Sequence, residues 1–255
     1  MRNFALPVIL SIFLLTACER VYMQPTPEPD RTASNILSRA AAGEGNAQLE
    51  VASNACDTHA GVYESDPSTA LHWWKKAAAN RDTRVSYQAH QQLGEYYLAE
   101  YAFDSYYLKD GAATRPPGTY KKVAKCRGEK PVKPDYKRAE YHFRKCADGD
   151  AMTGFTGLPA AQCRHGLGNL NFVRKNYAEA LFWYLSVTAA ADLMHHPDFD
   201  KWLAGVKDYR ELGFKGSRDD DYSRFAAERL SAKERAAVLK RVKAYVAGEM
   251  KKYAR

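Results

Sequence analysis

Hydrophobic and polar residues follow the period of an α-helix through most of the chain after about residue 33. Three segments, residues 66–78, 135–147 and 176–188, repeat one pattern. Each begins with Asp or Asn, which suits a helix N-cap, then places an alanine four positions later and a pair of ring-bearing residues beyond it. Residues four apart lie on one face of a helix. The pattern therefore predicts three helices that pack closely, with a small residue beside a large ring.

A second pattern precedes two of these segments, at residues 89–97 and 163–171. Both place a small residue four positions before a Leu-Gly pair. Glycine inside a helix costs about 1 kcal/mol relative to alanine, so its use indicates close contact with a neighbouring helix. Two amphipathic helices per unit, recurring along the chain, predict an all-α fold of the α-solenoid type.

Together the two patterns resemble the Sel1-like repeat, a relative of the tetratricopeptide repeat. The first helix of that repeat is matched by Ala89, Leu93, Gly94 and Tyr97. The second helix is matched by Asp135, Arg138, Ala139, Phe143, Lys145 and Ala147, and again by Ala180, Trp183 and Tyr184. The resemblance covers residues 61–192 and implies a scaffold that binds other proteins. We expect the repeat solenoid to span residues 33–192.

A long insertion interrupts the middle unit at about residues 98–134. The interval from Leu93 to Ala139 is more than three times as long as that from Leu167 to Ala180. Insertions in solenoids gather on one face and often bind partners. A structural flap over the core and variation without function are the alternatives. The partner-binding residues that we expect in the insertion are Tyr101, Tyr106, Tyr107, Tyr120, Lys121, Lys122 and Lys125.

Residues 193–255 are expected to form a degenerate repeat and C-terminal capping helices. Residues 199–212 have the pattern of one helix, and the three acids at 219–221 favour a helix start rather than a metal site. Ser231 and Glu234 predict a capping box before a long terminal helix. Such a helix can close the end of a solenoid, or dock on anionic lipid. Its apolar stripe consists of Leu239, Val242 and Val246, and the cations expected to face water include Lys240, Arg241 and Lys243.

The N-terminal residues 1–17 have the features of a secretory signal peptide. Arg2 precedes an apolar run that is shorter than the roughly 20 residues of a membrane-spanning helix. Cys18 after Leu-Thr-Ala resembles the lipobox of bacterial lipoproteins, which implies acylation of that cysteine. A chance cysteine after an ordinary signal peptide is the alternative. The proline-rich residues 18–32 are then a tether. In bacterial lipoproteins, an aspartate directly after the acylated cysteine is associated with retention in the inner membrane. This chain has Glu19 there, so we expect the periplasmic leaflet of the outer membrane.

The charge of the chain limits the classes of partner that we expect. The chain has 27% charged residues, a formal net charge of +8 and 17 tyrosines. A basic protein outside the cytoplasm does not meet chromosomal DNA, so we expect no nucleic-acid partner. Anionic lipid, peptidoglycan or an acidic protein fit this charge, although solubility alone is another explanation.

Four cysteines remain after Cys18, and an even number in an oxidising compartment predicts two disulfides with three possible connectivities. In cysteine-rich Sel1-like proteins the bridges join the two helices of one repeat, which here would require cysteines near Ala89 and Thr188. A loop-local alternative joins Cys146 to Cys163 and leaves Cys56 with Cys126. There is no C-x-x-C spacing to favour zinc or thioredoxin-type chemistry.

The sequence contains no H-E-x-x-H, G-x-S-x-G, Walker or full G-x-G-x-x-G motif, so we expect a binding protein without catalytic residues, cofactor or metal. Sel1-like lipoproteins resemble the immunity proteins that neutralise type VI secretion effectors, several of which are lipases or phospholipases. The first hypothesis is therefore a periplasmic immunity protein bound to a secreted toxin. The second is an envelope scaffold for peptidoglycan or polysaccharide machinery. A hydrolase of the cysteine-rich Sel1-like, penicillin-binding type is the third.

Overall fold

The computed structural model describes residues 33–56, 66–99, 126, 133–147, 159–192, 198–212 and 218–253. These residues belong to one compact unit, Ala33–Arg255. The expected signal peptide, the acylated Cys18 and the tether of residues 18–32 lie outside the described residues. What is described is therefore the helical body of the protein.

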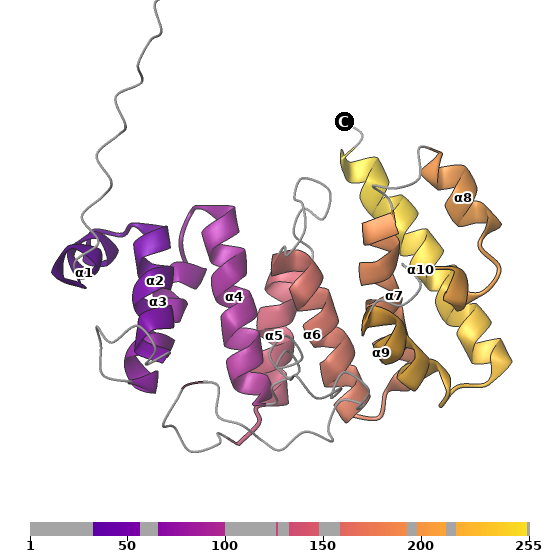
Figure 1. Cartoon of the computed structure of the whole chain (residues 1–255), viewed down its shortest axis with the longest axis horizontal. Coiled ribbons are helices and arrows are strands. Elements are labelled where there is room, and N and C mark those ends of the chain that lie inside the picture. The colour runs from indigo at the N-terminus through magenta and orange to yellow at the C-terminus, as the bar shows by residue number, and fades with distance from the viewer. Residues whose placement is uncertain are drawn as a thin grey trace, which may run out of the picture. The chain divides into compact units, whose positions relative to one another are not determined.

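The described residues form ten α-helices and one short 3-10 helix and contain no β-strand (Figure 1). The all-α class predicted from the periodicity is confirmed. Among the described residues, no helix combines the length and the apolar character needed to cross a membrane. In chain order the elements are α1 (Ala33–Ala41), α2 (Gly45–Cys56), α3 (Pro67–Ala78), α4 (Thr83–Leu98), α5 (Tyr136–Ala147), α6 (Pro159–Val173), α7 (Tyr177–Asp192), α8 (Phe199–Gly205), η4 (Tyr209–Glu211), α9 (Arg218–Ala227) and α10 (Ala232–Tyr253).

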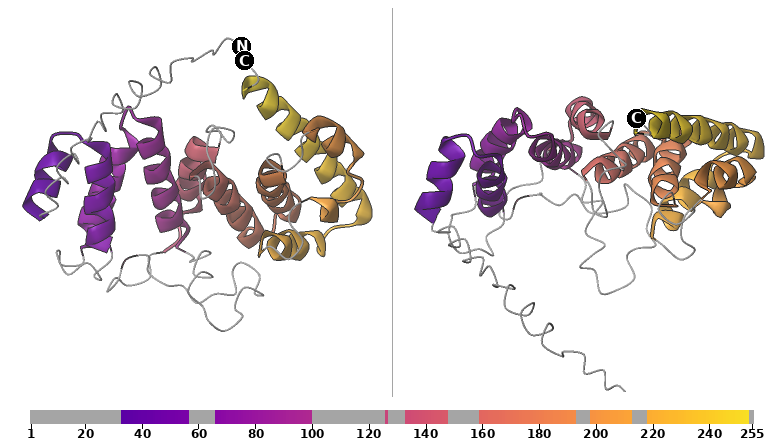
Figure 2. Two further views of the ribbon diagram at one scale, coloured as in Figure 1. Left: turned by 45° about the horizontal axis from the view of Figure 1, so that its top comes forward. Right: turned by 90° about the horizontal axis from the view of Figure 1, so that it is seen from above.

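From α1 to α7, helices that are neighbours in the chain are also neighbours in space. Each helix from α1 to α6 packs against the next one, and α4 also contacts α6. At the C-terminal end both α9 and α10 pack against α7, and Figure 2 shows α10 lying beside α7 in both views. Helix α5 thus lies between α4 and α6, whereas α7 is enclosed by α6, α9 and α10.

The expected cap residues precede α3, α5 and α7. The side chains of Asp66 and Asp135 each accept a hydrogen bond of 3.0 Å from a backbone N–H in the first turn of α3 and α5. These bonds satisfy donors that would otherwise have no partner at a helix start. Asn176 differs, because its side-chain amide donates to Asn171 Oδ1 at 3.3 Å. The turn between α6 and α7 is therefore held by a side-chain bond.

Small residues and rings pack as the repeated pattern predicts. A Cβ atom on Gly94 would lie 2.5 Å from the Phe143 ring, and one on Gly168 would lie 2.3 Å from the Tyr184 ring. Gly166 approaches the Phe143 ring from α6 in the same way. These distances leave no room for a side chain, which confirms that the glycines allow close helix contact. The alanine and ring pairs of the pattern are all buried: Ala70 and Trp74, Ala139 and Phe143, Ala180 and Tyr184.

Residues 199–212 form two short helices, so the prediction of one helix was wrong. Helix α8 ends at Gly205, and η4 follows Asp208, which forms a capping box with Glu211. Glycine weakens a helix interior, and an aspartate that caps a new turn competes with continuation of the helix. Lys243 does not face water as expected. It donates to two backbone carbonyls near the C-terminal end of α8, a favourable position for a cation.

Helices α9 and α10 close the C-terminal end of the described body. Helix α9 begins at Arg218, so the acids at 219–221 lie in its first turn. The capping box before α10 is present: Glu234 N donates to Ser231 Oγ at 3.3 Å, and Ser231 N donates to Glu234 Oε2 at 2.7 Å. The stripe predicted for α10 is buried, at Leu239, Val242 and Val246.

Candidate interaction face on α3 and α5

The seven tyrosines and lysines expected to bind a partner, residues 101–125, lie outside the described residues. The structure does describe the two ends of the insertion and Cys126 within it. The backbone N–H of Asp135 donates to the carbonyl of Tyr97 at 2.8 Å, which holds the two ends side by side. The insertion therefore leaves and re-enters the helical body next to the first turn of α5.

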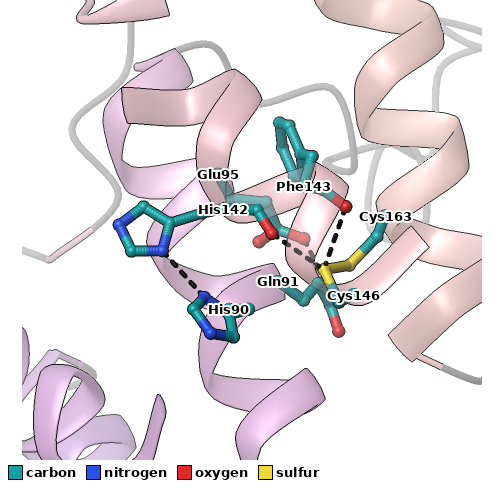
Figure 3. Close-up of a disulfide and its surroundings, with 7 residues drawn as sticks. All are labelled: His90, Gln91, Glu95, His142, Phe143, Cys146 and Cys163. Carbon is teal, nitrogen blue, oxygen red and sulfur yellow. Dashed lines mark hydrogen bonds between the residues drawn. A yellow bond between two sulfur atoms is a disulfide. The ribbon is translucent and has the colours of Figure 1, made fainter. Parts of the chain in front are cut away.

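Two disulfides are present, with the pairing that the loop-local alternative predicts. Cys126 is bonded to Cys56 at the end of α2, with Cα atoms 4.4 Å apart. Cys146 of α5 is bonded to Cys163 of α6, with Cα atoms 5.9 Å apart (Figure 3). Both sulfurs of the second bridge belong to fully buried residues. One bridge thus ties the insertion to α2, and the other holds α5 against α6.

Helix α5 carries an exposed stripe of cations around one tyrosine. Tyr141 is 56% exposed, and the only other large hydrophobic residue exposed among the described ones is Leu37. The exposed positions fall at i, i+1, i+4, i+7 and i+8, which is one face of a helix. On α3, the positions that match Arg144 and Lys145 are the exposed cations Lys75 and Lys76. We call this set the basic face: Lys75 and Lys76 of α3 with Lys137, Arg138, Tyr141, Arg144 and Lys145 of α5.

The carboxylates beside this face neutralise only part of its charge. Glu140 accepts hydrogen bonds from Arg174 at 2.6 Å and Arg144 at 3.1 Å. The hydrogen bond from Arg174, more than that from Arg144, lowers the pKa of Glu140. Arg138 lies 3.4 Å from a carboxylate oxygen of its own helix cap, Asp135. Ion pairs among the described residues do not include Lys75, Lys137 or Lys145.

Two histidines lie beneath the exposed stripe. His90 of α4 and His142 of α5 place their Nδ1 atoms 2.9 Å apart (Figure 3). The ring of Tyr97 stacks on His142, with centroids 5.5 Å apart and planes 8° from parallel. The ring of Tyr141 meets both imidazoles edge to face, at 6.3 Å and 5.1 Å. At 2.9 Å, one neutral imidazole donates to the other.

Burial and nearby cations keep both imidazoles uncharged at neutral pH. Burial, followed by the charges of His90, Lys75 and Arg138, lowers the pKa of His142 to about 4. Burial and Lys145 lower the pKa of His90 as well. Within the described ranges, no three His, Cys, Asp or Glu side chains form a group that could hold a metal ion. The pair is thus a hydrogen-bonded contact in a positive environment.

The basic face and the histidine pair were not predicted as a site. In the sequence His142 counted as half of a ring pair, and its neighbour Phe143 is indeed fully buried. His142 itself is only half-buried, and it contacts a histidine 52 residues earlier in the chain. The periodic run of cations around Tyr141 was the signal that could have revealed the face.

Comparison with known proteins adds no relative to this description. No protein-family model matches the chain, and no curated protein and no solved structure is similar to it at a significant level.

Proposed function

We propose that this protein is a lipid-anchored periplasmic α-solenoid that binds another protein. In this proposal the protein is an immunity protein that neutralises a secreted type VI effector, such as a phospholipase. It carries no catalytic residue and no cofactor of its own. Cys18 holds it at the periplasmic leaflet of the outer membrane, where an effector that attacks membranes would act.

The assignment to Sel1-like helix pairs is supported by two equivalent contacts. Gly94 of α4 faces Phe143 of α5, and Gly168 of α6 faces Tyr184 of α7. Each contact joins the first helix of a pair to its second helix at the same position of the pattern. Serial packing of neighbouring helices is typical of solenoids, whose broad surfaces bind proteins.

A difference in exposure between matching residues of α5 and α7 is the main support for the proposed protein-binding face. Tyr141 is 56% exposed, whereas Phe182 at the matching position of α7 is 7% exposed and lies against α10 through Tyr245. The protein thus covers one of these faces itself. An exposed tyrosine among cations offers a large contact area at small entropic cost, and the cations attract an acidic partner over a distance.

A competition experiment tests the immunity function. Cells that lack the gene should lose viability beside sibling cells with an active type VI secretion system, because the effector is no longer neutralised. Wild-type gene should restore survival. Equal survival of the deletion strain would contradict the immunity function and favour the alternative, an envelope scaffold that acts with peptidoglycan or polysaccharide machinery.

Charge variants tested in the same competition assay show which residues contact the effector. Charge reversal at Lys121, Lys122 and Lys125, or Lys145→Glu with Tyr141→Ala, should reduce protection and slow association with the effector, more strongly at low salt than at high salt. The matched control is Lys233→Glu with Lys240→Glu, which reverses exposed charges on α10. Equal loss in the control would mean that net charge, and not this face, determines binding.

The anchor is tested separately. Cys18→Ala should abolish labelling by a fatty acid and release the protein from membranes, because the acylated thiol is removed. Persistent labelling of the variant would contradict the lipoprotein assignment without affecting the protein-binding face.

A further inference from the structure

We propose, on the basis of the protein-binding function given above, that a carboxylate of the partner's Glu or Asp side chain binds at the histidine pair of α4 and α5. The residues of this histidine site are His90, His142, Lys75, Arg138 and Lys145. In this proposal the partner contributes an acidic side chain, which extends past Tyr141 to the two imidazoles.

The site consists of a half-buried imidazole surrounded by exposed cations. His142 is half-buried, and the ring of Tyr97 stacks beneath it at 5.5 Å. Around it the side chain of Arg138 is 65% exposed, and Lys75 and Lys145 are exposed. A carboxylate can therefore approach from solvent, while the methylene groups of its side chain contact the exposed ring of Tyr141.

Among the described residues, the side chains whose charges lower the pKa of the two imidazoles are cations. Lys75 of α3 and Arg138 of α5 act on His142, and Lys145 of α5 acts on His90. On α4, Glu95 accepts a hydrogen bond of 2.8 Å from Gln91. On α6, His165 and Arg164 lie beside the rings of Tyr184 and Tyr245.

Among the described residues, Arg138 pairs only with Asp135, and Lys75 and Lys145 pair with no carboxylate. Cations that are only partly neutralised repel one another, and a bound anion would relieve that repulsion. A metal ion would add to the repulsion instead. Arg138 can donate two parallel hydrogen bonds to a carboxylate, a geometry that favours this anion.

Binding of a carboxylate should be coupled to a proton. The bound anion favours the charged imidazole, so His142 takes up one proton from solvent and donates it in a hydrogen bond to the carboxylate oxygen. His90 then accepts from the other ring nitrogen or turns away. Affinity should consequently increase as the pH falls toward 5, while most glutamates of a partner remain ionised.

The test uses the mature lipoprotein in detergent micelles and a fluorescent hexaglutamate peptide. The dissociation constant from fluorescence anisotropy should be about tenfold lower at pH 5 than at pH 7.5. Labelled histidine followed by NMR should show that the peptide raises the pKa of His142. His142→Gln should remove the pH dependence, while His72→Gln, at an exposed position of α3, should retain it.

Charge variants provide the second arm. Lys75→Glu with Lys145→Glu should weaken hexaglutamate binding at least about tenfold, whereas Lys233→Glu with Lys240→Glu should change it less than about twofold. Unfolding midpoints of all variants are measured to show that each is folded. Unchanged pH dependence in His142→Gln, or equal weakening in the α10 control, would overturn the carboxylate site.

Inorganic phosphate distinguishes an acidic side chain from a free anion. Phosphate, added to give the same concentration of negative charge as the peptide, should leave the pKa of His142 unchanged and should not displace the peptide. Equal displacement by phosphate would overturn the assignment of a partner's side chain. Loss of this site and loss of the immunity function are distinguishable, because the competition assay with the wild-type protein does not depend on the peptide.

Discussion

The helix pairs α4–α5 and α6–α7 share one sequence pattern and one internal packing, but their outer faces differ. In both pairs a glycine of the first helix meets a ring of the second, Phe143 or Tyr184. On the outer side α5 exposes Arg144 and Lys145, whereas the matching Leu185 and Ser186 of α7 are each 1% exposed. A repeat can therefore hold its core constant and use its outer face for different purposes.

The cause of this difference is the C-terminal part of the chain. Helices α9 and α10 pack against α7, and Arg241 of α10 pairs with Glu179 of α7 at 2.8 Å. In the α6–α7 pair, Arg164 occupies the position that corresponds to His90. Arg164 is 1% exposed and lies over the ring of Tyr245 of α10 at 5.7 Å. The outer face of α7 is thus covered by the C-terminal helices, and the α4–α5 pair keeps a basic surface.

The largest effect is expected where the two outer faces are exchanged. Leu185→Arg should lower the free energy of unfolding by about 5 kcal/mol or more, because it buries a charge without a partner and removes apolar contacts. Arg144→Leu at the matching position should change it by less than about 1 kcal/mol, since it loses one exposed ion pair. Urea denaturation measures both. Similar losses would contradict the difference in coverage.

A loss of about 4 kcal/mol is expected for Phe143→Ala, because a buried ring between Gly94 and Gly166 would leave a cavity. The adjacent control, Tyr141→Ala, should cost less than about 0.5 kcal/mol, as expected for an exposed site. Thermal and urea unfolding distinguish the two. A costly Tyr141→Ala would mean that the basic face is part of the core.

Removal of the bridge between α5 and α6 should cost about 3 kcal/mol, the chain-entropy value for a loop of its length. The variant is Cys146→Ser with Cys163→Ser, and unfolding is followed under non-reducing conditions. The matched variant, Cys56→Ser with Cys126→Ser, should leave the contact between Gly94 and Phe143 protected from hydrogen exchange. Loss of that protection would show that the insertion bridge supports the α4–α5 core.

Acidification should destabilise the α4–α5 pair through His142. Its pKa is about 4 in the folded protein, below that of an unfolded histidine near 6.5. Between these values the unfolded chain binds more protons, so stability is present above pH 6.5 and decreases as the pH falls toward 4, by about 2 kcal/mol after allowance for solvent screening. His142→Gln should flatten this part of the pH profile, and an unchanged profile would assign the effect to other groups.

The smallest effect concerns the ring that differs between the pairs. Tyr184 donates to Asn169 Oδ1 at 2.8 Å, whereas its counterpart Phe143 has no hydroxyl. Tyr184→Phe should cost about 1 kcal/mol, because a buried amide oxygen loses its hydrogen bond. Phe143→Tyr should be at least as costly, since it would bury a hydroxyl among apolar groups. A neutral Tyr184→Phe would indicate that Asn169 finds another donor.

Local patterns were sufficient to predict α3 to α7 and the close contacts of their glycines. A helix start depends on the side chain that caps it, and a helix face depends on residues three and four apart. Asp66, Asp135, Gly94 and Gly168 therefore revealed their roles in the sequence. The break after Gly205 was missed, because a cap at Asp208 competes with an apolar period that continues past it.

The sequence by itself determined the all-α class, the place of the insertion and the face of each helix that is apolar, because these depend on near neighbours in the chain. The tertiary structure decided which outer face remains exposed and brought His90 within 2.9 Å of His142. Both outcomes depend on contacts between distant segments, namely α10 against α7 and α4 against α5. Burial and charge at His142 exist only after those contacts form, so no local pattern could have shown its lowered pKa.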